Sequence, residues 1–147
     1  MLTVRDLLKV KGEGIWAVSP ETSTLDALRF MAEKNVGALL VLEDGLLVGI
    51  ISERDFVYQI AQERACQFDL PVQDYMTTEV ISVTPDQTIE DCMKLMTDKH
   101  FRHLPVLQDG YLIGLISIGD VVKGIIGEQS SMINSLENYI LGTGYGQ

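Results

Sequence analysis

The chain has 147 residues, enough for one domain of ordinary size or two very small ones. Hydrophobic residues make up 46% of it, but they come in short runs, far below the roughly 20 residues that a membrane-spanning helix needs. The formal net charge of −10 argues against non-specific binding to nucleic acid, because such binding depends on Lys and Arg side chains. The first residues lack a basic region followed by an apolar run, so we expect a cytoplasmic protein.

The chain contains the same unit twice. Residues 15–60 align with residues 80–125 without a gap, and 17 of the 46 aligned positions are identical, where chance gives about three. A weaker match precedes each copy, where residues 4–8 resemble residues 72–76. We therefore divide the chain into a first repeat at 3–66, a second repeat at 70–126 and a helical tail at 127–147.

Each repeat is expected to begin with a helix, followed by a strand and a second helix. The strand is short and apolar, and it ends at Val18 or Val83, ahead of a proline. Ser23-x-x-Asp26 and its counterpart at 88–91 have the spacing of a capping box, which is typical of a helix start. The apolar residues that follow recur at helical spacing and predict one buried helix face.

Two further strands and a last helix complete each repeat. Apolar runs flank Asp44-Gly45 in the first copy and residues 109–110 in the second. Asp-Gly between apolar runs predicts a hairpin, because the tight turn needs positive φ angles. The last helix of each repeat starts at Ser52 or Ser117.

The tail continues this last helix in the second repeat. Ile133, Leu136, Ile140 and Leu141 lie at helical spacing, and Gly142 ends the pattern. Nothing in the first repeat corresponds to this amphipathic segment, so we expect it to mediate self-association, with a homodimer as the product.

Each last helix opens with the pattern Ser-x-x-Asp, at Ser52 and Asp55 and again at Ser117 and Asp120. One interpretation is structural, since Ser at a helix N-cap with an acid three residues later is a capping arrangement. The other is functional, since the start of a helix offers unpaired N–H groups to a phosphate. In that case the Ser hydroxyl can donate to the phosphate and the Asp carboxylate can accept from both hydroxyls of a ribose.

The two copies resemble a tandem pair of CBS (cystathionine-β-synthase) domains, together called a Bateman module. The Asp-Gly hairpin, the Gly-x-hydrophobic-Ser-x-x-Asp stretch and the Leu-Pro-Val strand within residues 102–106 carry this resemblance, which extends from residue 3 to about 126. It implies an α/β fold of two β-α-β-β-α repeats packed around a pseudo-two-fold axis, with a C-terminal helix. The chain also resembles stand-alone prokaryotic CBS-pair proteins with no attached enzyme.

The resemblance also implies a regulatory ligand that contains adenosine: AMP, ADP, ATP, NAD(H) or S-adenosylmethionine. The Asp would hold the ribose, the Ser with nearby basic residues would hold phosphate, and adenine would lie against main chain between strands. The implied sites comprise, in the first repeat, Ile15, Trp16, Ala38, Leu39, Ser52, Arg54 and Asp55, and in the second repeat, Val80, Ile81, Arg102, His103, Leu104, Ser117, Gly119 and Asp120.

The two implied sites differ in where their positive charge lies. The first has Arg54 directly before its Asp, whereas the second has Gly119 there and carries Arg102 and His103 on its middle strand. A guanidinium group suits phosphate, and glycine permits a close approach of backbone. We therefore favour the Asp120 site, while exposed arginines with no specific role remain the alternative.

Other chemistry has little support. His100 and His103 lack the further ligands of a metal site, and Cys66 and Cys92 are best explained as reduced interior thiols. No nucleophile with a neighbouring base is visible, so we expect no catalytic residues and no required cofactor. The sequence predicts a non-enzymatic sensor of an adenine nucleotide, with AMP first; the alternative is a ligand-free scaffold or protein-interaction module whose motifs only cap helices.

Overall fold

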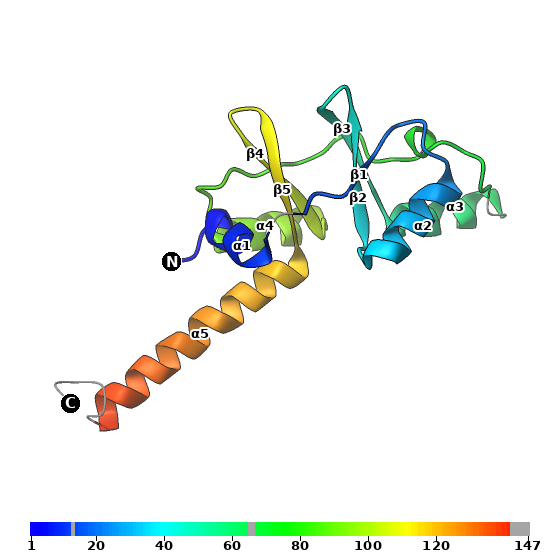
Figure 1. Cartoon of the computed structure of the whole chain (residues 1–147). Helices are drawn as coiled ribbons and strands as arrows, with labels where there is room; N and C mark the ends of the chain where they lie inside the picture. The colour runs from blue at the N-terminus through cyan, green and yellow to red at the C-terminus, as the bar shows by residue number, and fades with distance from the viewer. Residues whose placement is uncertain (13, 65–66, 142–147) are drawn as a thin grey trace. The chain divides into compact units, whose positions relative to one another are not determined.

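The computed structural model describes residues 1–12, 14–64 and 67–141 of the chain. Figure 1 shows a mixed α/β protein with two small sheets, so the predicted fold class with a C-terminal helix is confirmed. The elements in chain order are α1 (Val4–Lys11), β1 (Ala17–Val18), α2 (Thr24–Lys34), β2 (Ala38–Glu43), β3 (Leu46–Ser52), α3 (Glu53–Glu63), the 3-10 helix η1 (Val72–Asp74), α4 (Ile89–Lys99), β4 (His103–Gln108), β5 (Tyr111–Ser117) and α5 (Ile118–Leu141).

Two elements predicted for the second repeat differ from the structure. The helix expected over residues 72–76 is only the three-residue η1, which follows Pro71. No strand ends at Val83, which forms a single bridge. The backbone N–H of Val80 donates to the carbonyl of Thr78 at 3.0 Å, and residues 80–82 form no strand, unlike β1 in the first repeat.

The predicted hairpins and helix caps are confirmed. In the first repeat Asp44 and Gly45 have φ angles of 52° and 79°, and the corresponding turn of the second repeat has 52° and 82°. These positive values give the turn a twist that matches its flanking strands. Ser23 and Thr88 cap α2 and α4, each accepting from the backbone N–H three residues later.

The sheet of the first repeat has the strand order β1-β2-β3, with β1 parallel and β3 antiparallel to β2. Its core forms where α2 and α3 pack against β2 and β3. The buried residues of this core are apolar and come from all four elements and from the start of η1: Ala27, Met31, Leu39, Val41, Ile51, Phe56 and Val72.

The chain forms two compact units, and each draws on separate stretches of sequence. The described residues of the first unit are 1–12, 83–104 and 116–141, and those of the second unit are 14–64, 67–82 and 105–115. Each unit thus combines helices of one repeat with the segment that opens the other repeat. We call residues 1–12 the first leader and residues 70–77 the second leader.

The first leader is held in the first unit by backbone hydrogen bonds. Val4 N–H donates to the carbonyl of Gln87 at 2.8 Å, and Ile89 N–H donates to the carbonyl of Leu2 at 3.1 Å. Gly124 on α5 lets α1 approach, because a Cβ atom there would lie 2.7 Å from a methyl carbon of Leu7. The first leader is therefore a fixed part of the unit that contains α4 and α5.

The second leader makes the corresponding bonds in the second unit. Val72 N–H donates to the carbonyl of Thr22 at 2.9 Å, and Thr24 N–H donates to the carbonyl of Leu70 at 2.8 Å. Thr22 and Thr24 correspond in the repeat to Gln87 and Ile89, so the same pattern of bonds occurs in both units. The repeats have exchanged their leaders.

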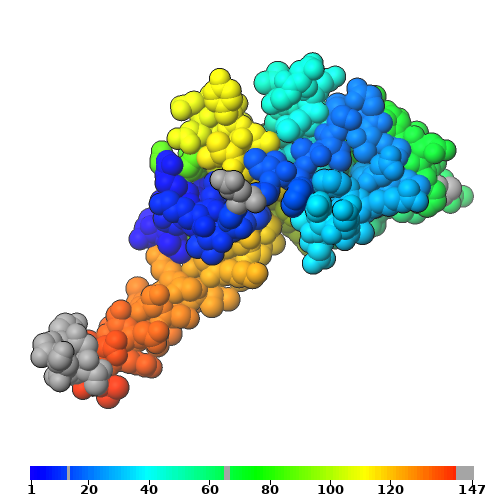
Figure 2. Space-filling view, viewed as in Figure 1, coloured from blue at the N-terminus to red at the C-terminus, as the bar shows by residue number. Residues whose placement is uncertain are grey.

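α5 is a single helix of 24 residues, and its C-terminal half extends beyond α1 (Figure 2). Large apolar side chains are exposed along it, including Ile133, Leu136 and Ile140 of the predicted tail. None of the described helices combines the length and the hydropathy needed to cross a bilayer. Gly142, expected to end the helix, lies outside the described residues.

Candidate functional site

The Ser-x-x-Asp motif of the first repeat joins β3 to α3. The backbone N–H and the hydroxyl of Ser52 both donate to Oδ2 of Asp55, at 2.8 Å and 3.1 Å. The hydroxyl of Thr77, in the second leader, donates to Oδ1 at 3.4 Å. Among the described residues, the hydrogen-bond partners of this carboxylate are neutral groups, and both of its oxygens accept hydrogen bonds.

The other predicted residues of the first site lie at the same edge of the sheet. Ala38 pairs with Ser52, and the backbone N–H of Leu40 donates to the carbonyl of Trp16 at 3.1 Å. Leu39 and Ala38 are buried, so a ligand at this edge would meet their main chain more readily than their side chains. The structure therefore brings the residues before β1, the start of β2 and the start of α3 together, and their assignment to one ligand site stays a prediction.

Two of these side chains already have partners. The guanidinium group of Arg54 donates to the hydroxyl of Tyr58 at 2.8 Å and 3.1 Å, one turn along α3. The ammonium group of Lys34 lies 4.4 Å from the centre of the Trp16 ring, which is 38% exposed. Arg54 therefore lies along α3, and Trp16 has a cation on one face, which favours a wall position over an open stacking surface.

The motif of the second repeat joins β5 to α5 with the same local geometry. The backbone N–H of Ser117 donates to Oδ2 of Asp120 at 2.8 Å, and the N–H of Asp120 donates to the Ser117 hydroxyl at 3.2 Å. The N–H of Ile118 donates to the carbonyl of Arg102 at 2.8 Å, as Glu53 does to Gly37 in the first repeat. The two motifs thus share the bond from the Ser N–H to the Asp carboxylate and the bond from the first helical N–H to a carbonyl of their own repeat.

The leader supplies a different partner in this second motif. Nζ of Lys11, on the last turn of α1, lies 2.8 Å from Oδ2 of Asp120, and the two side chains are 33% and 21% exposed. Partial burial raises the pKa of Asp120, but the hydrogen bonds from Lys11 and Ser117 outweigh it, so the pKa lies below its usual value. Asp120 is therefore an ionised carboxylate with a cation in contact.

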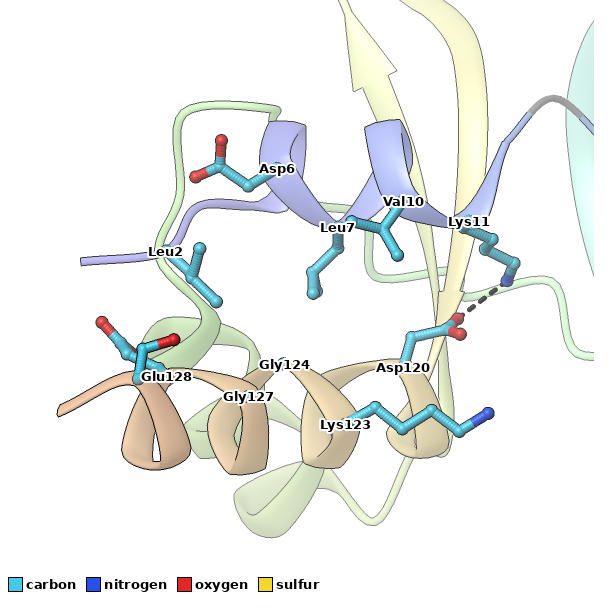
Figure 3. Close-up of a pocket in the computed structure, with 11 residues that line it drawn as sticks. Leu2, Asp6, Leu7, Val10, Lys11, Asp120, Lys123, Gly124, Gly127 and Glu128 are labelled. Atoms are coloured by element: carbon cyan, nitrogen blue, oxygen red, sulfur yellow. Dashed lines mark hydrogen bonds and ion pairs between the residues drawn. The ribbon is translucent and has the colours of Figure 1, made fainter. Parts of the chain in front are cut away.

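A cavity of about 750 Å³ opens between α1 and α5, with Asp120 in its lining (Figure 3). Leu2, Leu7 and Val10 give it an apolar wall, and Gly127 leaves α5 bare on the opposite side. Lys11 and Lys123 lie with Asp120 at one end, and Asp6 and Glu128 lie at the other. This volume is within the range of small-molecule sites.

The residues predicted for the second site are divided between the two units. Arg102, His103 and Leu104 lie in the first unit with the Ser117 motif, whereas Val80 and Ile81 lie in the second. Leu104 is fully buried. A side chain at Gly119 would lie 3.5 Å from the Ser117 hydroxyl, an ordinary contact. The assignment of these residues to one site stays a prediction.

Sequence reasoning missed Lys11, Lys123 and Thr77. The weak match between the two leaders was the one available signal, and it does not reveal that each leader serves the other repeat. Lys123 has no such signal, because the first repeat has Tyr58 at the corresponding position. The exchange of leaders is what brings Lys11 and Thr77 to the two carboxylates.

The cysteine and histidine predictions concern residues away from these motifs. Cys92 is buried on α4, and burial together with the nearby Asp91 raises its pKa to about 11. The thiol is therefore protonated at neutral pH. Cys66 lies outside the described residues. Within residues 1–12, 14–64 and 67–141, no three His, Cys, Asp or Glu side chains are grouped so that they could hold a metal ion.

Comparisons with known proteins find relatives that are similar in sequence and in fold. The mitochondrial CBS domain-containing protein CBSX3 of Arabidopsis thaliana is 39% identical over 150 residues, and the alignment covers 95% of this chain and 72% of that protein. The crystal structure of the CBS-domain protein ATU1752 from Agrobacterium tumefaciens is 38% identical with a TM-score of 0.81, covering 83% of this chain and 98% of that one. The structure of CBSX2 in complex with AMP is 31% identical with a TM-score of 0.71, covering 88% and 99%.

The family profile described as the CBS domain matches residues 13–62 and again residues 72–127. These two segments cover the hairpins and both Ser-x-x-Asp motifs, and they leave out the first leader and the end of α5. The chain therefore belongs to the CBS-domain family and contains two CBS domains in tandem.

Proposed function

We propose that the chain is a non-enzymatic regulatory module that binds an adenine nucleotide, with AMP as the first candidate and ADP, ATP and NAD(H) as others. The observation that carries the proposal is the repeated motif, in which Ser52 and Ser117 each start a helix and each hold an Asp at 2.8 Å. The AMP complex of CBSX2, a relative by sequence and fold, supports this choice of ligand.

In this proposal each motif contributes the same two functions. Asp55 and Asp120 accept from ribose hydroxyls, while Ser52 and Ser117, with the first N–H groups of α3 and α5, face the phosphate. Adenine contacts main chain at the start of β1 and β2 in the first site, and at the corresponding residues in the second. Ligand binding then changes the protein only as far as the ligand's affinity differs between two conformations.

The second candidate is a scaffold without a ligand. One observation favours it, because both Asp side chains already accept from the backbone of their helix starts, as structural caps do. The two candidates differ in what removal of a carboxylate does. A cap contributes about 1 kcal/mol to stability, whereas a ribose contact also contributes to affinity.

The test is calorimetry with AMP on the wild type and on Asp55→Asn, Asp120→Asn and the double variant. Asn keeps an oxygen that can accept from the Ser N–H but cannot accept two ribose hydroxyls as strongly as a carboxylate. We expect each single variant to lose one binding event or to weaken it roughly 10- to 100-fold, and the double variant to show the same loss at both sites. Equal binding by the wild type and the double variant would rule out both proposed sites.

We also propose that α5 mediates a homodimer and that the protein acts in the cytoplasm. Ile133, Leu136 and Ile140 are each more than half exposed on α5, and an apolar surface of this kind is typical of a protein contact. Sedimentation should give a dimer for the full chain and a monomer after deletion of residues 128–147. A monomer in both cases would remove the dimer from the proposal. An unidentified regulated protein is a further partner that the module could serve.

A further inference from the structure

One face of α5 carries a regular stripe of exposed side chains. Its residues follow one another at alternating intervals of four and three positions, which is the heptad spacing of a coiled coil. All are apolar except Gln129, and the apolar ones are between 41% and 77% exposed. We call this stripe the seam, and it consists of Val122, Ile126, Gln129, Ile133, Leu136 and Ile140.

The seam lies on the side of α5 that faces away from α1. Gly124 and Ser131 line the cavity between the two helices, and each is two positions from the nearest seam residues. Two positions along a helix correspond to a rotation of about 200°, so the cavity and the seam lie on opposite faces of α5. A second helix can therefore lie along the seam without displacing α1.

The two flanks of the seam differ in character. One flank carries the polar residues Lys123, Ser130 and Glu137, and the other carries the apolar residues Ile125 and Met132. In a parallel pair of helices each flank lies against the opposite flank of the second helix. Reversing one helix brings like flanks together. An antiparallel pair thus places apolar side chains against apolar ones, whereas a parallel pair places them against polar ones.

Antiparallel pairing also brings opposite charges together. When two seams overlap fully, their centre falls at residue 131, and Lys123 of each copy faces Glu137 of the other. Both side chains are exposed, and within the part of the chain that the structure describes neither has an ion-pair partner. A parallel pair would instead place Glu137 beside Met132 of the second copy. Charge complementarity therefore favours the antiparallel orientation.

We infer that two copies of the chain pair through their α5 helices in an antiparallel orientation, with Glu137 of each copy beside Lys123 of the other. Lys123 lines the cavity at the end where Asp120 lies, so each copy contributes a carboxylate near the edge of the other copy's cavity (Figure 3). The inference rests on the α5 homodimer of the proposed function and deepens it, because it gives the pairing an orientation and a register.

Disulfide cross-linking tests the orientation. Ile126→Cys and Leu136→Cys are made separately in the full chain with Cys66→Ser, while the native Cys92 is buried. An antiparallel pair places residue 126 of one copy against residue 136 of the other, but keeps two copies of residue 126 roughly 15 Å apart, too far for a disulfide. We expect an equimolar mixture to form covalent dimer under mild oxidation, and each variant alone to form at least about fivefold less.

Charge reversal tests the register. Lys123→Glu or Glu137→Lys places like charges together at both pairs, so the dissociation constant of the dimer should rise roughly 5- to 30-fold in sedimentation at low salt. A mixture of the two variants restores both pairs and should return to within about threefold of the wild type. Glu128→Lys makes the same charge change on the cavity face of α5 and should stay within about threefold as the matched control.

The possible failures are distinguishable from one another. Covalent dimer from each cysteine variant alone would show parallel pairing, and a dimer that gives no cross-link from the mixture would lie elsewhere on the chain. Either result overturns the inference and leaves the proposed homodimer standing. Cross-linking of the mixture without any effect of charge reversal would overturn the contact between Lys123 and Glu137. A wild type that stays monomeric up to roughly 300 µM would remove the inference together with the homodimer, while calorimetry with AMP still decides the nucleotide sites.

Discussion

The motif at Asp55 and the motif at Asp120 have the same backbone and different partners. In both, the Ser N–H donates to Oδ2 of the Asp at 2.8 Å. The first N–H of the following helix donates to the backbone carbonyl of the residue 16 positions earlier, which is Gly37 or Arg102. The contacts that differ come from the leaders, which supply the hydroxyl of Thr77 to one carboxylate and the ammonium group of Lys11 to the other. The repeated part of the chain thus sets geometry, and the exchanged part sets charge.

Glycines that seat the two leaders offer the strongest test of this difference. A Cβ atom at Gly49 would lie 2.6 Å from Sδ of Met76 and 3.0 Å from the backbone carbonyl of Thr77. Because backbone cannot yield as a side chain can, we expect Gly49→Ala to destabilise the protein by about 2 kcal/mol in urea unfolding. It should also weaken ligand binding at Asp55, since it moves the segment that carries Thr77.

The matched variant is Gly124→Ala, where the new methyl group meets the flexible end of Leu7 at 2.7 Å. Ala is about 1 kcal/mol better than Gly within a helix, which offsets the cost of the contact. The net change should stay within about 1 kcal/mol of the wild type. If the two substitutions destabilise the protein equally, the two leaders resist the added methyl group to the same extent, and the contrast between a backbone and a side-chain contact is wrong.

The second prediction concerns the buried contact beside each leader. The Thr24 hydroxyl donates to the carbonyl of Leu70 at 2.8 Å and bonds to the hydroxyl of Tyr75, whereas the second repeat has Ile89 at the corresponding position. We expect Thr24→Val to destabilise the protein by about 1 kcal/mol, because a buried hydrogen bond is lost without a change in shape. Thr24→Ser keeps the hydroxyl and should retain more of the stability than Val does. A neutral Thr24→Val would show that the polar contact adds nothing beyond packing.

The third and smallest prediction is the stability that Lys11 gives through Asp120. Because the pKa of Asp120 is lowered in the folded state, this contribution is present above the unfolded pKa and disappears as the pH falls through the folded pKa. Lys11→Met should therefore cost no more than about 1 kcal/mol at pH 7, as expected for a pair that solvent partly screens. Urea unfolding from pH 7 to pH 3 should show this difference shrinking below about pH 4. A difference that does not change with pH would assign the effect of Lys11 to packing.

Local features of the repeats were predictable because they depend on nearby residues. Asp44-Gly45 determines its turn through two φ angles, and Ser23 caps α2 through the N–H of a residue three positions later. The edge that joins Trp16, Ala38 and Ser52 followed from strand order and the position of the motif. Each of these inferences needed only the order of elements within one repeat.

The exchange of leaders and the missing strand at Val83 were not predictable from the pattern. A backbone bond between Val4 and Gln87 joins residues that share no motif, so no local signal marks it. The strand was expected from the similarity to β1, but the turn at Thr78 and Val80 depends on local backbone geometry that the alignment does not reveal. The pairing of Asp120 with Lys11 was not predictable for the first of these reasons, because Lys11 belongs to the first leader and contacts a motif of the second repeat.

The exchange also sets the order in which the protein can be completed during synthesis. The first leader emerges from the ribosome before the residues that form its backbone bonds, because Gln87 and Ile89 are made roughly 80 residues later. At about 5–20 residues per second, α1 waits for seconds with its apolar face uncovered. Pairing across such a sequence distance is slow to form, so the closure of the first unit is expected to be a late step of folding.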